Sequence, residues 1–150
     1  MRRRQEPRDD LITHLVTVRD GTDRLHEDEL IASAILLLNA GHEASVNALG
    51  GGFVALCRHP DQLARLRADR SLVAAAIEEM IRYDPPLHLF ERTATADVDV
   101  CGVTVTAGQK IAALLGAANR DPVAFAEPDS YDVGRNPNPH VGFGAGIHFC

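Results

Sequence analysis

The stretch 143–150, which reads FGAGIHFC, limits the local fold more than any other part of the chain. Its two glycines are spaced by one residue and allow a tight turn whose backbone N–H groups point inward. N–H groups directed at the sulfur of Cys150 would stabilise its thiolate, which Phe143 and Phe149 would shield, and such a thiolate is a strong metal ligand. The alternative is a glycine-rich turn that ends in a buried free cysteine, because free cysteine is often buried.

Three further short stretches precede this loop: AGHEAS at 40–45, EMIR at 79–82 and ANRDP at 118–122. Together with 143–150 they resemble four motifs of the cytochrome P450 family, in which the last motif is the haem-binding loop. The resemblance extends over the whole chain and is greatest to the soluble bacterial branch of the family. Four motifs in the family's order are far more specific than any one of them.

The resemblance implies a fold that is mainly α with a small β region. We expect a partial cytochrome P450 fold with a long central helix, a helix that carries the ExxR motif, short strands, an irregular meander and the haem-binding loop. Family members are much longer than 150 residues. Residues 1–150 are therefore expected to form the C-terminal-half portion of a single P450 domain, incomplete at both ends and stopping at the ligand cysteine.

Composition excludes several classes of partner. The net charge of −6 leaves no basic face for phosphate groups, which argues against nucleic acid. Cys57, Cys101 and Cys150 are odd in number and widely spaced, so no disulfide framework is implied, as in a reducing cytoplasm. The aliphatic run at 34–38 is far too short to span a bilayer. We expect a cytoplasmic chain with neither a nucleic-acid partner nor a membrane partner.

Periodicity and turn residues predict the secondary structure. Helices are expected at 9–19, ended by Asp20-Gly21, and at 27–57, 62–67 and 72–83, the last with Ser71 as its N-cap. Short strands are expected at 89–95, 98–101, 103–106 and 110–114, then a helical turn at 117–121 and an irregular meander over 121–141.

The long helix carries two unusual stretches. Residues 30–38 are apolar nearly all round, which predicts burial on every side. Glycines 50–52 should cost up to about 3 kcal/mol within a helix, so we expect close packing or a local break there.

Two carboxylates compete for one arginine in the EMIR stretch. Glu79 and Glu78 precede Arg82 by three and four residues, and both spacings place the partners on one helix face. Spacing alone leaves the choice open, and an exposed pair would contribute little. The resemblance assigns the pair to Glu79, as a buried brace beneath the haem. The family's usual third partner is an arginine before the haem loop, and Ser130 stands at that place, so we expect a brace that lacks one charge.

The resemblance implies a haem whose iron is bound by Cys150, because thiolate ligation favours breaking the O–O bond of dioxygen. Further residues match the family's haem contacts: Arg92, His140 and His148 toward the two carboxylates, with Phe143 and Gly144 in the loop. The alternative for Arg92 is a solvent-facing strand residue, and the two histidines, judged alone, fit ordinary loop residues better than haem contacts. A zinc site is disfavoured, because the spacing matches no usual structural zinc motif and lacks a fourth ligand.

The AGHEAS stretch matches the part of the family that lies over the oxygen-binding face of the haem. There an acid followed by threonine commonly organises proton delivery, whereas here Glu43 is followed by Ala44. Ser45 points about 100° further round the helix. We expect Glu43, Ser45 and bound water to carry protons. The remaining candidates line the substrate pocket by resemblance: Ala40, Gly41, Ala44, His88, Leu89 and Phe90. The alternative for Ala40 and Gly41 is close helix–helix packing, and the alternative for Leu89 and Phe90 is packing in the core.

The sequence thus favours a haem-thiolate monooxygenase that inserts one oxygen atom of O2 into an organic substrate. Its electrons would come from a ferredoxin and a ferredoxin reductase, and secondary metabolism is the favoured setting. One alternative is a haem-thiolate binding or sensing protein without turnover, suggested by the missing threonine. Another is a truncated, inactive product, and the 150-residue chain by itself is expected to be inactive.

Overall fold

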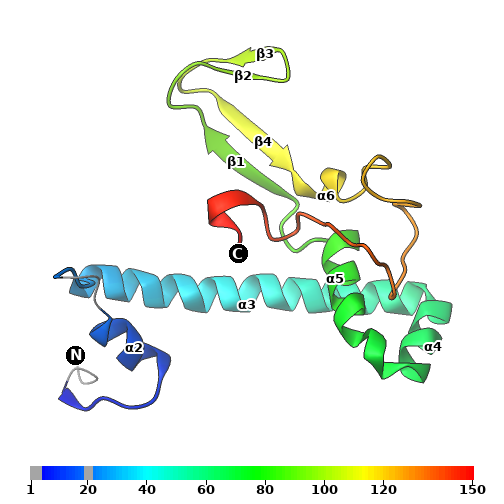
Figure 1. The fold of residues 1–150 in the computed structure, drawn as a ribbon, viewed down its shortest axis with the longest axis horizontal. Helices are drawn as coiled ribbons and strands as arrows, with labels where there is room; N and C mark the ends of the chain where they lie inside the picture. The colour runs from blue at the N-terminus through cyan, green and yellow to red at the C-terminus, as the bar shows by residue number, and fades with distance from the viewer. Residues whose placement is uncertain (1–4, 19–21) are drawn as a thin grey trace. The chain divides into compact units, whose positions relative to one another are not determined.

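The structure is a computed structural model that describes residues 5–18 and 22–150. It divides into two compact units, Met1–Glu43 and Ala44–Cys150, and each unit is described by itself. Figure 1 shows the order of helices and strands along the chain. The predicted class, mainly helical with a small β region, is confirmed.

The first unit contains helix α2 (Leu11–Thr17) and the beginning of helix α3 (Glu27–Arg58). The Asp10 carboxylate caps α2 by accepting the Thr13 N–H at 2.8 Å. The Glu29 side chain accepts the His26 N–H at 2.7 Å, which satisfies a donor at the start of α3. Helix α2 is shorter than the predicted 9–19, and its expected end at residues 20 and 21 lies outside the described residues.

The apolar stretch of α3 is not buried as predicted. Leu30 is 2% exposed, but the large apolar side chains that follow it lie open: Ile31, Ile35, Leu36, Leu37 and Leu38. A helix that is apolar all round is buried only where other elements pack on every side of it. The described residues of this unit do not supply those neighbours, so the prediction is wrong for this structure.

The second unit packs its core around the end of α3. Helices α4 (Pro60–Ala68) and α5 (Val73–Tyr83) follow, joined by the short 3₁₀ helix η1 (Arg70–Leu72). The buried core cluster comes from α3, α5 and the later loop: Ala55, Leu56, Ala76, Tyr131 and Val133.

The predicted N-cap of α5 is a second correction. Ser71 lies inside η1, and the Asp69 carboxylate accepts both its N–H at 2.9 Å and its hydroxyl at 2.6 Å. Asp69 therefore caps η1, and α5 begins at Val73 without a side-chain cap. These two hydrogen bonds hold the pKa of Asp69 below its usual value.

The three consecutive glycines lie within the continuous helix α3, so no break occurs, and close packing accounts for two of them. A Cβ at Gly52 would overlap the Met80 side chain, and one at Gly51 would lie 2.9 Å from Asp84 Oδ2. Gly50, by contrast, faces open space. Helix α5 can approach α3 this closely because Gly51 and Gly52 carry no side chains.

Two alanine substitutions test this packing. Gly50→Ala should stabilise the chain by about 1 kcal/mol, because alanine has the higher helix propensity and meets nothing. Gly52→Ala gains the same propensity but forces Met80 to move, and overpacking typically costs about 1–3 kcal/mol. We expect Gly52→Ala to be the less stable variant in urea unfolding. Equal stability of the two variants would contradict the close approach of α5.

The strands form two antiparallel pairs. Strand β1 (Leu89–Thr93) pairs with β4 (Lys110–Leu114), and β2 (Val98–Val100) pairs with β3 (Val103–Val105). Cys101 and Gly102 turn between β2 and β3 with φ of 52° and 80°. Helix α6 (Leu115–Ala118) follows, and the described residues 119–145 contain neither helix nor strand before the 3₁₀ turn η2 (Gly146–His148). The predicted strands and meander are confirmed, with ends shifted by up to two residues.

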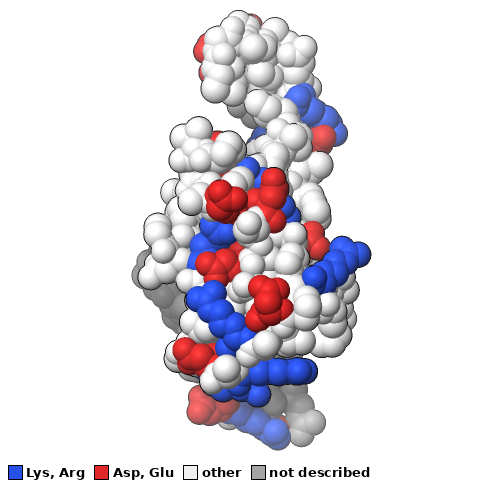
Figure 2. All heavy atoms as spheres, turned by 90° about the vertical axis from the view of Figure 1, so that its right-hand side faces the viewer, with Lys and Arg blue, Asp and Glu red and all other residues white. Residues whose placement is uncertain are grey.

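Charge on the second unit is mixed. Figure 2 shows Lys and Arg side chains interspersed with Asp and Glu over the face it presents, without a large patch of either sign. Within the described ranges 5–18 and 22–150, no helix is both long enough and apolar enough to cross a bilayer.

Candidate functional site

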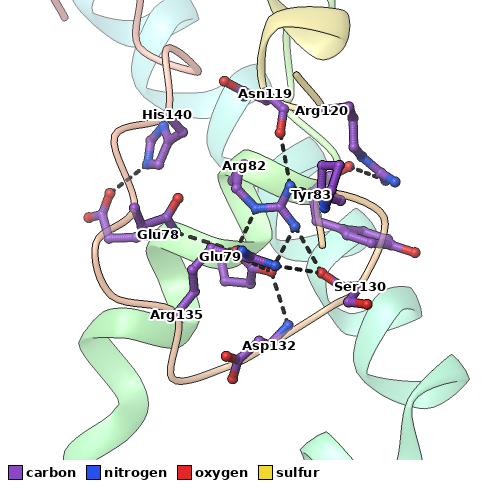
Figure 3. A network of polar contacts seen from close by, with 12 residues as sticks. Glu78, Glu79, Arg82, Tyr83, Asn119, Arg120, Ser130, Asp132, Arg135 and His140 are labelled. Carbon is purple, nitrogen blue, oxygen red and sulfur yellow. Dashed lines mark hydrogen bonds and ion pairs between the residues drawn. The ribbon is translucent and has the colours of Figure 1, made fainter. Parts of the chain in front are cut away.

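A buried ion pair on α5 organises the second unit (Figure 3). Arg82 Nε lies 2.7 Å from Glu79 Oε2 and Arg82 Nη2 lies 2.8 Å from Glu79 Oε1, and both side chains are 0% exposed. This two-point contact is the strongest geometry between a guanidinium and a carboxylate. Glu78 does not compete, because its carboxylate lies elsewhere, at His140.

Arg82 also ties α5 to the meander. Its Nη1 donates to the backbone oxygens of Asn119 and Pro128, each at 2.8 Å. Its Nη2 donates to the backbone oxygen of Ser130 at 3.1 Å. One buried side chain therefore fixes three points of a segment that has no regular secondary structure.

A third charged residue completes this network and corrects the sequence prediction. Arg135 Nε lies 3.0 Å from Glu79 Oε2, so the network does not lack a charge. Ser130 contributes its backbone oxygen, which accepts from Arg135 Nη2 at 2.9 Å. Matching the sequence to the family by position missed Arg135, because the meander folds back and places this residue next to Glu79. The available signal was that Arg135 is the sole Lys or Arg between residues 121 and 150.

Arg120 fastens the end of α5 to the same meander. Its Nη2 donates to the backbone oxygen of Tyr83 at 2.8 Å, and its Nη1 lies 2.8 Å from Asp129 Oδ1. The guanidinium also lies over the Tyr83 ring, 4.0 Å from the centroid, which adds a cation–π contact.

Tyr131 lies buried in the core cluster near the ion-pair network. Its hydroxyl oxygen has no hydrogen-bond partner among the described residues. Burial, followed by the negative charge of Glu79 and then Tyr83, raises the pKa of Tyr131 to about 12. The neutral phenol is thus strongly favoured in the folded chain.

Replacing this phenol should raise stability by an amount that grows at high pH. The unfolded pKa is about 10, so the contribution of neutral Tyr131 is complete below pH ~10 and is lost as the pH rises towards the folded value of about 12. The full loss is on the order of 3 kcal/mol. Because the buried hydroxyl has no partner, we expect Tyr131→Phe to be at least as stable as the wild type in urea unfolding near pH ~8, and its advantage to be larger near pH ~11. A stability difference between the two proteins that does not change from pH ~8 to pH ~11 would contradict the raised pKa.

The loop that ends at Cys150 turns at its two glycines, as the sequence predicts. Gly144 and Gly146 both have φ of 77°, a conformation that favours glycine. The Cys150 N–H donates to the Phe143 backbone oxygen at 3.2 Å, and the Cys150 side chain lies at the surface. The alternative of a buried free cysteine is therefore not what the structure shows. The Phe143 and Phe149 rings meet edge to face at 6.1 Å, with Phe149 61% exposed.

His140 anchors the start of the loop to α5. Its Nδ1 accepts the Gly142 N–H at 3.2 Å, so the ring proton lies on Nε2, which donates to Glu78 Oε2 at 2.7 Å. Both ring nitrogens thus have partners within the described chain. The His148 side chain lies outside what the structure describes.

Strand β1 lies beside the cysteine loop. A Cβ at Gly144 would lie 3.7 Å from Phe90 Cε2, which places the half-buried Phe90 ring at the glycine turn. The exposed Arg92 guanidinium lies 5.6 Å from the centroid of that ring and donates one N–H to the Glu91 backbone oxygen. The structure therefore brings Phe90, Arg92 and the loop together.

The other predicted substrate-side residues are less closely connected. Leu89 is exposed, and His88 Nε2 lies 3.5 Å from Asp84 Oδ1 at the surface. Ala40, Gly41 and Glu43 belong to the first unit, whereas Ala44 and Ser45 belong to the second, all within α3. Gly41 faces open space, so the described residues give no support to close helix packing as its reason.

The residues around Cys150 suit a haem bound by one thiolate. Across 5–18 and 22–150, no three His, Cys, Asp or Glu side chains gather in a group that could hold a metal ion. The aromatic rings of Phe143 and Phe149, on the loop that ends at Cys150, suit a flat apolar macrocycle. The exposed guanidinium of Arg92 suits one of its carboxylates.

Comparison with known proteins identifies the family that the chain resembles. The family model for cytochrome P450 matches residues 1–150. The chain is 44% identical over 149 residues to the biotin biosynthesis cytochrome P450 of Bacillus subtilis, covering 99% of this chain and 38% of that protein. It is 46% identical over 150 residues to 6-deoxyerythronolide B hydroxylase of Saccharopolyspora erythraea, covering 99% of this chain and 37% of the relative.

A solved structure agrees with these sequence matches. The crystal structure of P450BioI in complex with an acyl carrier protein ligated to hexadec-9Z-enoic acid superposes with a TM-score of 0.92 at 44% identity. That match covers 99% of this chain and 38% of the solved one. The chain thus spans 37–38% of the length of the two curated relatives.

Proposed function

The chain belongs to the cytochrome P450 family, and from this membership we propose that it is part of a bacterial haem-thiolate monooxygenase. The reaction is the insertion of one oxygen atom of O2 into an organic substrate, and residues 1–150 form a portion of a single domain. The observation that carries the proposal is the glycine turn, which lies against Phe90 at Gly144 and ends in the exposed thiol of Cys150.

Cys150 is the residue that binds iron in this proposal. A haem with a thiolate ligand supplies the activation of dioxygen, because the electron-rich sulfur favours cleavage of the O–O bond. Arg92, His140 and His148 would bind the two haem carboxylates. Phe143 and Gly144 would lie against the macrocycle, and the Glu79–Arg82–Arg135 network holds the meander that leads into the loop.

Glu43 and Ser45 are proposed to pass protons, together with water, towards the oxygen that is reduced. Both side chains are exposed on α3, and the half-buried Ala44 between them provides no hydroxyl. Ala40, Gly41 and Ala44 on this helix are proposed as substrate-binding residues, and so are residues 88–90 at the start of β1.

Two substitutions in the full-length protein test this proton path. Ala44→Thr adds the missing hydroxyl and should raise the fraction of consumed electrons that appears in product. Glu43→Gln removes the carboxylate and should lower turnover by about 10²–10⁴-fold, the usual contribution of a positioned acid or base. Product and electron consumption are measured together. If both variants behave as the wild type does, Glu43 and Ser45 do not carry the protons.

The partners follow from the same membership. We propose a ferredoxin and its reductase as electron donors, a cytoplasmic location, and an organic substrate of biosynthetic or secondary metabolism. One solved relative was crystallised with a fatty acyl group on a carrier protein, and another relative is named a hydroxylase of 6-deoxyerythronolide B. A substrate presented on a carrier protein is therefore included among the candidates.

One experiment separates the monooxygenase from a binding or sensing protein, the alternative that Ala44 in place of threonine favours. The full-length protein is reduced and exposed to carbon monoxide, and its Soret band is recorded. A strongly red-shifted band indicates thiolate-bound haem. Product that depends on electron supply then supports the monooxygenase, whereas the shifted band without turnover supports the sensor. Absence of the shifted band contradicts both.

A further inference from the structure

Asn119 connects the buried ion-pair network to the loop that ends at Cys150. The residue is 0% exposed. Its backbone oxygen accepts Arg82 Nη1 at 2.8 Å, and its side-chain oxygen Oδ1 accepts the Val141 N–H, also at 2.8 Å. Figure 3 shows Asn119 beside Arg82 on the segment that follows α6.

Short backbone contacts continue this connection through the loop. The Val141 oxygen accepts the Gly144 N–H at 2.8 Å and closes the first glycine turn. The Phe143 oxygen accepts the Cys150 N–H at 3.2 Å. A continuous series of contacts therefore runs from Arg82, through Asn119 and the turn, to the cysteine.

We propose that Asn119 is a positioning residue for the iron ligand: its side-chain oxygen fixes the backbone at Val141 and thereby the orientation of the Cys150 thiolate. The proposal deepens the function proposed above and rests on it, because a haem-thiolate bond is what the orientation serves. Asn119 itself touches neither substrate nor iron.

The energetics of the Asn119 amide support this role. Its other polar atom, Nδ2, is buried without a hydrogen-bond partner among the described residues. A buried donor without a partner is unfavourable, and an apolar side chain of similar size would avoid that penalty. What an apolar side chain would lose is the acceptor for the Val141 N–H. The unpaired Nδ2 of Asn119 therefore destabilises the fold, whereas the hydrogen bond accepted by Oδ1 stabilises the loop.

The second anchor of the loop is less protected. His140 binds Glu78, whose side chain is 52% exposed, so water competes with this contact. The Asn119 contact comes from a fully buried side chain and keeps its strength. We therefore expect Asn119 to dominate in holding residue 141.

The experiment compares two variants that lose the acceptor with one that keeps it. Asn119→Leu and Asn119→Ala both remove the side-chain oxygen. Two such variants are used so that, if one of them does not fold, the other still tests the proposal. Asn119→Asp keeps an oxygen at the same place. Leu56→Ala, in the core cluster, is the control for lost stability away from the loop. All four substitutions are made in the full-length protein and compared with the wild type.

The first readout is hydrogen exchange at the Val141 amide, which does not depend on activity. Loss of the acceptor should raise its exchange rate by about tenfold or more. The second readout is the fraction of carbon monoxide complex with the red-shifted Soret band. This fraction should fall in Asn119→Leu and Asn119→Ala and be retained in Asn119→Asp and Leu56→Ala.

Two results would overturn the proposal: a wild-type exchange rate at Val141 in both acceptor-less variants, or an equal loss of the shifted band in Leu56→Ala. Failure of the proposed function gives a different pattern, because the wild type itself then lacks the shifted band. In that case the exchange measurement still decides whether Asn119 holds the loop.

Discussion

Replacing Arg82 with methionine should destabilise the chain by about 3–5 kcal/mol, the usual cost of removing one partner from a buried ion pair. The substitution leaves Glu79, which is 0% exposed, without its two-point contact, and leaves the backbone oxygens of Asn119 and Pro128 without their donor. Measurement is by urea unfolding at neutral pH. Because typical domains are stable by about 5–15 kcal/mol, a loss of this size is a large part of the total.

Arg65 provides the matched control for this result. Arg65 pairs with Asp132 on the same meander, but the two side chains are 48% and 42% exposed. Exposed pairs contribute about 0–1 kcal/mol, so Arg65→Met should be nearly neutral. Arg135→Met should destabilise the chain clearly more than Arg65→Met does, since Arg135 Nε meets the buried Glu79 carboxylate. Equal effects of Arg82→Met and Arg65→Met would show that the buried network does not organise the second unit.

Replacing Cys150 with serine should abolish the thiolate signature of the haem-loaded full-length protein and, with it, product formation. Serine has a similar size, but its hydroxyl is not ionised near neutral pH and does not provide the electron-rich sulfur that favours O–O cleavage. The red-shifted Soret band of the reduced carbon monoxide complex reports the ligand directly. We expect none of it in Cys150→Ser.

The two other cysteines are the natural controls for this substitution. Cys57 and Cys101 are free and exposed, as Cys150 is, but lie on α3 and at the β2–β3 turn. Cys57→Ser and Cys101→Ser should keep the shifted band and the turnover of the wild type. Loss of the band in either of them, or its retention in Cys150→Ser, would contradict the assignment of the ligand.

Features that depend on neighbouring residues were predictable from sequence. The strands at 89–114 follow from alternation and turn residues, and the long helix from its apolar period. Gly144 and Gly146 indicated the turn that the structure shows at those positions. The cost of glycine in a helix predicted either close packing or a break at 50–52, and the structure shows close packing of Gly52 against Met80, a partner that the sequence did not indicate.

Features that depend on distant residues were not predictable in the same way. Arg135 reaches Glu79 across 56 residues of chain, and no local pattern specifies how the meander folds back. His140 contacts Glu78, 62 residues away, and no local pattern indicates that pairing. The exposure of residues 31–38 shows that helical burial is set by surrounding elements and not by composition. In each case the position of the side chain depends on contacts between residues that are far apart in the sequence.

The bond between Cys150 and iron is the central claim, and X-ray absorption at the iron edge tests it most directly. The sample is the haem-loaded full-length protein, with Cys150→Ser measured beside it. The account predicts a sulfur neighbour of iron in the wild type that is absent from the variant. Only nitrogen and oxygen neighbours in the wild type, or an unchanged sulfur signal in Cys150→Ser, would contradict it.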